Sequence, residues 1–199
     1  MNKVQTLLAK QQEQLEKVLK EENKKFNALP VAKKRVAIAK DVLLLLQSKN
    51  ISPEQGTYFS FDVEDIENTN DNNAQLLLLQ DGAKCECCAM GMIFLSRVRL
   101  GNKCTVKEID NHNDSWSNRP DELIIKKNKG IFSESQLRLI EMAFEGNDAA
   151  EYFEKKVSVE ELEIMEEKAE EFIGKYSNTS ERIEAIMKNI IENKGTFKL

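Results

Sequence analysis

The stretch from Cys85 to Arg99 constrains the fold most, because apolar side chains cover almost its whole circumference when it is drawn as a helix. These side chains belong to Ala89, Met90, Met92, Ile93, Phe94, Leu95 and Val98. A helix that is apolar on every side is normally buried, and Gly101 suits its C-terminal cap. We therefore predict a central helix from Cys85 onward, around which the other elements pack.

Amphipathic helices are predicted on both sides of this segment. Pro30 suits the first turn of a helix that follows it, with an apolar face formed by Ala32, Val36, Ala39, Leu43 and Leu46. Three capping signals each precede an apolar stripe and mark further helix starts. They are Ser133 with Gln136, Ser158 with Glu161, and Asn178 with Glu181.

Strand signals are few and short. Residues 57–61 are rich in aromatic side chains and predict a strand, and residues 104–109 and 123–125 are two further candidates. Residues 51–56 read as a turn, 62–73 as an exposed loop and 74–80 as a short helix. The predicted fold class is mostly α, a compact helical domain with a small two- or three-stranded β element and an added N-terminal helix.

The N-terminal helix is predicted over residues 3–27 and ends near the one plausible domain boundary, Pro30. Its partial apolar stripe is broken by glutamines, so it does not sustain the heptads of a coiled coil. We predict a helical extension over residues 1–29 and a single mainly helical globular domain over 30–199. The extension suits contact with a partner or formation of a homo-oligomer.

Charge is distributed unevenly along the chain. Residues 1–40 hold ten basic and four acidic side chains, a balance of +6, whereas residues 41–199 hold nineteen and thirty, a balance of −11. An acidic body repels phosphate backbones, so general nucleic-acid binding is disfavoured.

Secretion and membrane insertion are also disfavoured by the sequence. The longest apolar runs, Val42–Leu46 and Leu76–Leu79, are far shorter than the roughly 20 residues of a membrane span. The first residues lack the apolar core of a signal peptide. We expect a cytoplasmic protein whose cysteines are reduced.

The cysteines and the single histidine allow two chemical hypotheses. Cys85, Cys88, Cys104 and His112 supply the soft ligands that zinc prefers, which would make the chain a zinc-stabilised interaction module. Alternatively, Cys88 near a helix N-terminus with His112 as its base would form a cysteine-dependent enzyme. Buried, reduced thiols that pack as small apolar groups are the reading we favour, with no cofactor and no catalytic residue.

A basic and aromatic middle segment is the candidate ligand site. Its cations would pair with an anionic or nucleotide-like ligand, and its rings would stack on one. The candidate residues are Tyr58, Phe59, Arg97, Arg99, Lys103, Trp116 and Arg119. Cations at the end of a helix also complement its dipole without any ligand.

Four blocks taken together resemble a family of small uncharacterised proteins from bacteria and their phages. The blocks are residues 35–43, 85–91, 132–146 and 181–197. The likeness spans the chain from about residue 31 onward, and the family carries no assigned activity, so it implies no functional residue. A phage setting implies a stoichiometric binder that acts on a host protein or a signal.

The sequence thus favours a non-enzymatic intracellular binding protein. Its target would be a host protein or a small anionic ligand near the middle segment. The cysteine enzyme and the zinc module remain the alternatives.

Overall fold

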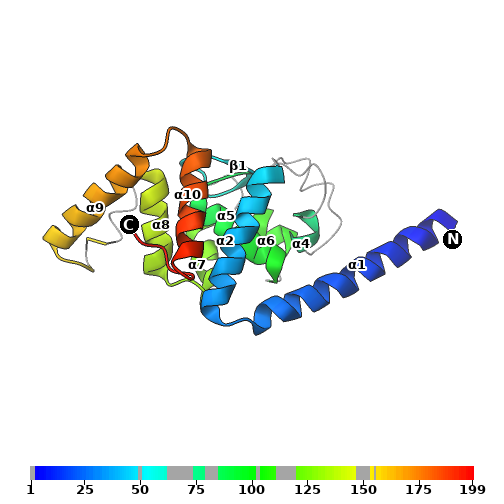
Figure 1. Cartoon of the computed structure of the whole chain (residues 1–199). Coiled ribbons are helices and arrows are strands. Elements are labelled where there is room, and N and C mark those ends of the chain that lie inside the picture. Colours follow the sequence, from blue (N-terminus) through cyan, green and yellow to red (C-terminus); the bar gives the residue numbers. More distant parts are fainter. Residues whose placement is uncertain are drawn as a thin grey trace.

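The computed structural model describes residues 3–48, 51–61, 74–78, 85–101, 104–110, 120–146, 153–154 and 156–199 (Figure 1). The fold is mostly helical with a small three-stranded sheet, which confirms the predicted fold class. The helices are α1 (Lys3–Ala28), α2 (Val31–Ser48), α4 (Ala74–Leu77), α5 (Ala89–Leu100), α6 (Val106–Asp110), α7 (Pro120–Asn128), α8 (Glu134–Glu145), α9 (Val159–Gly174) and α10 (Thr179–Glu192). The strands are β1 (Ile51–Pro53), β2 (Ser60–Phe61) and β3 (Cys85–Cys87).

Helix α5 forms the centre of the molecule, as its apolar circumference predicts. Every residue from Ala89 to Ser96 is buried, and so is Val98. Helices α1, α2, α4, α7 and α8 all pack against it. Together with α5, the sheet and α10, these helices form one large cluster of buried apolar side chains.

Residues Cys85–Cys87, just before α5, form a strand and not a helical turn, so the predicted helix start at Cys85 is wrong. Strand β3 lies in the middle of the sheet, parallel to β1 and antiparallel to β2. Cys85 is opposite both Ile51 and Phe61. These partners come from distant parts of the chain, and pairing with them outweighs the local helical pattern.

Two predicted strands are wrong for a different reason. Residues 104–109 and 123–125 fall largely in helices α6 and α7. Pro120 opens α7 and Asp121 and Glu122 lie in its first turn, which are favourable positions for proline and for acidic residues. Of the strand predicted over residues 57–61, only Ser60–Phe61 form a strand. The first three residues of the turn predicted over 51–56 form strand β1.

The three predicted helix starts near the C-terminus are confirmed. Ser133, Ser158 and Asn178 are the N-caps of α8, α9 and α10, and each side chain accepts a hydrogen bond from a backbone amide. Ser158 and Glu161 form a complete capping box. The loop predicted at 62–73 lies outside the described residues.

Helix α1 extends away from the body, whereas α9 lies at the opposite edge (Figure 1). The C-terminal end of α1 is anchored to the body: Phe26 is buried, and Asn23 exchanges two side-chain hydrogen bonds with Gln75 in α4. In the described part of the chain, no helix has the length and hydropathy required to cross a membrane.

Candidate functional site

A small cavity lies where the 55–58 turn, the start of α5 and helix α8 meet. Its volume is about 100 Å³. The residues around it are Gly56, Thr57, Tyr58, Cys88, Arg138, Glu141 and Glu145. It therefore joins two of the residues singled out in the sequence, Tyr58 and Cys88, to three charged residues of α8.

Glycine at position 91 allows the turn to approach this closely. A Cβ atom there would lie 1.6 Å from the carbonyl oxygen of Tyr58 and 2.9 Å from the Cβ atom of Cys87. The backbone of the turn also accepts a hydrogen bond of 2.6 Å from the amide of Cys88 to the carbonyl of Thr57. The start of α5 and the turn are thus in direct backbone contact.

Tyr58, Glu141 and Arg138 form a buried polar network at this cavity. The hydroxyl of Tyr58 donates to Oε1 of Glu141 at 2.5 Å, and Nη1 of Arg138 donates to Oε2 of the same carboxylate at 2.8 Å. Nη2 of Arg138 donates to Asp121 in α7 at 2.7 Å. Glu141 is only 7% exposed, and a buried carboxylate is normally retained only when it is paired in this way.

The pKa shifts agree with this geometry. Burial and then the charge of Glu141 raise the pKa of Tyr58, so the phenol remains a hydrogen-bond donor. Burial opposes the charge of Arg138, but the hydrogen bond and charge of Glu141 and the hydrogen bond of Asp121 outweigh it and raise the pKa of Arg138. Tyr58 therefore stays a neutral phenol and Arg138 stays a cation at neutral pH.

The side chains that line the cavity carry net negative charge. Glu145 adds a second carboxylate, whose Oε2 accepts a hydrogen bond from the amide of Gly56 at 3.0 Å. Arg138 is the single cation among the lining residues, against Glu141 and Glu145. An anionic ligand is therefore unfavourable here, and the network links the turn to α8.

Cys88 is the N-cap of α5, close to where the sequence placed it. Burial and then the charge of Glu145 raise the pKa of its thiol, although amides of Gly91 and Met90 act in the opposite direction. The thiol is 2% exposed and stays protonated at neutral pH, which is unfavourable for a nucleophile. His112, the base of the cysteine-enzyme hypothesis, lies outside the described residues.

The remaining cysteines are also buried as free thiols. Burial raises the pKa of Cys104 to about 12 and raises the pKa of Cys87 as well. Within the described ranges, no group of three His, Cys, Asp or Glu side chains is arranged to hold a metal. The zinc set of Cys85, Cys88, Cys104 and His112 stays a prediction, since its histidine is not described.

The candidate anion-binding residues are spread over two ends of α5. Tyr58 lies at the cavity near its N-terminus, and Phe59 is buried in the core, where its ring stacks on Phe94 with centroids 5.3 Å apart. Arg97 and Arg99 lie in the last turn of α5, about 12 Å further along the helix. Lys103, Trp116 and Arg119 lie outside the described residues.

The two described arginines are engaged with the protein itself. Nη2 of Arg99 pairs with Oδ1 of Asp41 in α2 at 2.5 Å, and Asp41 is 5% exposed. The guanidinium of Arg97 lies over the ring of Phe26 at 5.3 Å from its centroid. Arg99 is thus neutralised by Asp41, and Arg97 ties α5 to the anchored end of α1.

Sequence reasoning missed Arg138, Glu141 and Glu145, although one signal was present. Glu141 lies in the apolar stripe formed by Leu137, Ile140 and Phe144. A charged residue on the buried face of a helix indicates a buried partner. Only the fold shows that this partner is Tyr58, from the turn before β2.

No protein-family model, no curated protein and no solved structure matches this chain.

Proposed function

We propose that this protein is a non-enzymatic binding protein that acts stoichiometrically on a partner protein. The outer part of α1, residues 13–22, would be the contact element, and we call it the arm. The observation that carries the proposal is the exposure of its apolar side chains. Leu15 is 44% exposed and Val18 is 59% exposed.

The arm continues a stripe that the body itself uses. Leu15, Val18 and Phe26 lie on one face of α1, because residues separated by about one, two or three helical turns are aligned. Phe26 is 5% exposed and packs into the core, whereas Leu15 and Val18 are exposed on α1, the helix that extends away from the body (Figure 1). A partner that covers the arm would extend an existing apolar contact.

Helix stability favours the same conclusion. A helical segment without tertiary contacts is marginal in water, since most helical stability in proteins comes from packing of an apolar face. Within the arm, Lys17 and Glu13 form an exposed ion pair of 2.7 Å, and such pairs contribute little stability. Association would therefore stabilise the arm.

The anchor of α1 makes the arm suitable for specific contact. Asn23 and Gln75 bond each other through both side-chain amides, at 3.1 and 2.8 Å. Nδ2 of Asn27 also donates to the carbonyl of Gly101 at 3.3 Å. These bonds fix the base of the arm to α4 and α5.

A protein partner fits the structure better than a small anion. Of the candidate anion-binding residues, Arg99 pairs with Asp41 and Arg97 lies over the ring of Phe26. The cavity at Tyr58 is acidic. If the chain is phage-encoded, as the resemblance implies, the partner would be a host protein. A second copy of the chain is the alternative. The four buried free thiols fit a reducing compartment, and we expect the cytoplasm.

The experiment is site-specific photo-cross-linking in cells that express the full chain. A photoreactive residue replaces Leu15 or Val18 on the apolar face, and Lys17 on the opposite face is the matched control. We expect one adduct of defined mass from positions 15 and 18 and none from position 17. Mass spectrometry of the adduct separates a partner protein from a second copy. No adduct, or equal adducts at all three positions, would contradict the proposal.

A further inference from the structure

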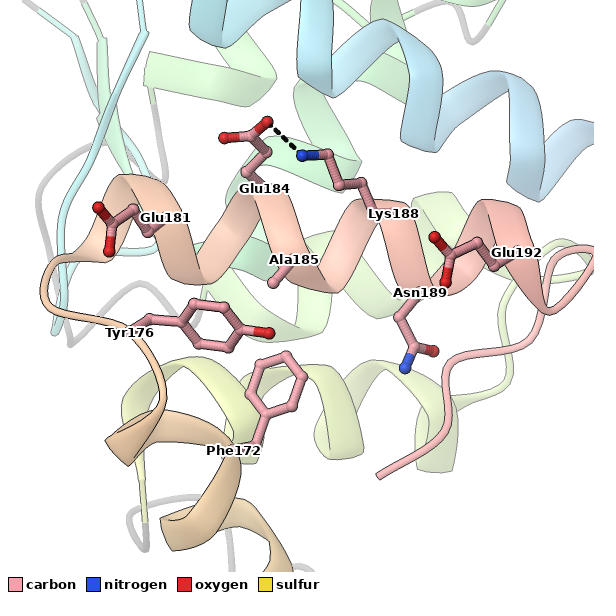
Figure 2. A pocket seen from close by; sticks show the side chains of 8 residues that line it. All are labelled: Phe172, Tyr176, Glu181, Glu184, Ala185, Lys188, Asn189 and Glu192. Carbon is pink, nitrogen blue, oxygen red and sulfur yellow. Dashed lines mark ion pairs between the residues drawn. The ribbon is translucent and has the colours of Figure 1, made fainter.

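A groove lies between the end of α9 and the outer face of α10, on the body of the molecule and away from the arm (Figures 1 and 2). Its volume is about 440 Å³. Phe172 and Tyr176 line one side, and the α10 residues Glu181, Glu184, Ala185, Lys188, Asn189 and Glu192 line the other.

The α10 side of this groove is the face opposite to the core. The buried residues Ile183, Ile186, Met187 and Ile190 form the inner stripe of the helix. Glu181, Glu184, Lys188 and Glu192 recur at three- and four-residue spacing on the outer stripe. Ala185 lies among them, and its small side chain leaves room for a group to approach the helix (Figure 2).

The aromatic side of the groove is fixed by ring contacts. The ring of Phe172 lies 5.1 Å from that of Tyr176 and makes an edge contact of 5.9 Å with that of Phe197. The segment that carries Phe197 is tied to α10 by two hydrogen bonds between Asn189 and the backbone of Lys198, at 2.8 and 3.0 Å. The rings are therefore positioned before any partner arrives.

The charge of the lining is negative. Three glutamates face one lysine, and that lysine, Lys188, is paired with Glu184 at 2.7 Å. Glu181 lies at one end of the groove. Its carboxylate accepts hydrogen bonds from the amide and the hydroxyl of Ser177, just before α10. Glu192 lies at the other end, and no ion pair joins it to the other lining residues drawn in Figure 2.

The groove already holds one cation, Lys188. Its pKa is raised first by the hydrogen bond that it donates to Glu184 and then by the charges of Glu184 and Glu192. The same groups would act on a cation brought by a partner. Aromatic faces attract ammonium and guanidinium groups, and carboxylates pair with them.

We propose that the α9–α10 groove is a docking site for a basic, extended segment of a partner protein, with a lysine or arginine side chain against Tyr176 and the flanking cations at Glu181 and Glu192. Those two glutamates are separated by eleven residues of helix, or about 16 Å. About five residues of extended chain cover that length. The segment would therefore carry basic residues about five positions apart. This site is separate from the arm and does not depend on it.

The test uses the full-length protein and fluorescence anisotropy of a short Gly/Ser peptide that carries three arginines, two of them about five residues apart and one between them. We expect saturable binding that weakens as salt is added. A peptide with glutamine at all three positions should not bind. Spermine, tested as a competitor, shows whether a free polyamine is held more tightly than the peptide; tighter binding of spermine would overturn the assignment to a protein segment.

Two substitutions locate the binding. Tyr176→Ala should weaken it by about tenfold, and Glu192→Gln by about two- to fivefold. Glu163→Gln, on α9 outside the groove, changes net charge by the same amount and should have no effect. Leu15→Asp should also have no effect, which separates this site from the arm. If wild type does not bind the peptide, or if Glu163→Gln weakens binding as much as Glu192→Gln, the proposal is wrong.

Discussion

Replacement of Gly91 by alanine tests the contact that joins the 55–58 turn to α5. The added Cβ would lie 1.6 Å from the carbonyl oxygen of Tyr58, where ordinary contacts begin at 3.4 Å, so the turn would have to move by about 1.8 Å. That movement would break the 2.6 Å bond from Cys88 to Thr57 and strain the bond from Tyr58 to Glu141.

The expected cost follows from these losses. Overpacking costs about 1–3 kcal/mol, and each lost hydrogen bond costs about 0.5–1.5 kcal/mol. The better helix propensity of alanine offsets about 1 kcal/mol. With both hydrogen bonds lost, we therefore expect Gly91→Ala to lower the free energy of unfolding by about 1–5 kcal/mol.

Urea denaturation followed by circular dichroism measures this change, with Gly174→Ala as the matched control. A Cβ at Gly174, the last residue of α9, meets no atom within 4 Å, so the control should be neutral or slightly stabilising. The reasoning is refuted if the two variants have the same free energy of unfolding within about 0.5 kcal/mol.

Two further predictions concern ion pairs. Asp41→Asn should lower the free energy of unfolding by about 2–4 kcal/mol, because it leaves Arg99 without its buried partner; a urea titration checks this, and an effect below about 0.5 kcal/mol would contradict it. Burial opposes ionisation of Glu108, but hydrogen bonds from Lys127 and Thr105 outweigh it and lower the pKa of Glu108 to about 2. The stability that this carboxylate supplies is therefore complete above its ordinary pKa of 4.5 and is lost as pH falls toward 2. Lys127→Gln should reduce this acid loss and raise the pKa in an NMR titration, and an unchanged pKa would refute the assignment.

Local signals were sufficient to predict most helices. The caps at Ser133, Ser158 and Asn178 satisfy amides in their own first turn, so sequence alone identifies them. The apolar circumference of the 89–98 segment has one physical solution, which is burial at the centre. These features depend on neighbours in the sequence.

Non-local pairing could not be predicted in the same way. Strand β3 exists because Cys85 pairs with Ile51 and Phe61, and no residue near Cys85 indicates those partners. In α7 the signal was present, since Pro120 and Asp121 favour a helix start, but the apolar run after them was given more weight.

The same distinction applies to the candidate sites. Tyr58 and Cys88 were selected for their chemistry and do share a cavity, but the acidic character of that cavity comes from Glu141 and Glu145 on α8. The α9–α10 groove combines the end of one helix with the outer face of the next. Tyr176, which follows α9, and Ala185 of α10 line the same groove because of the way the chain turns between the two helices (Figure 2).

The burial of the cysteine-bearing segment in the core is the basis of the proposal that the protein acts through its surface. Thiol labelling of the native, full-length protein tests this most directly. Because all four cysteines are buried, we expect each to react only as fast as the protein opens, and much faster after addition of denaturant. One cysteine that reacts in the native protein as quickly as an exposed thiol would contradict the claim and favour chemistry at that residue.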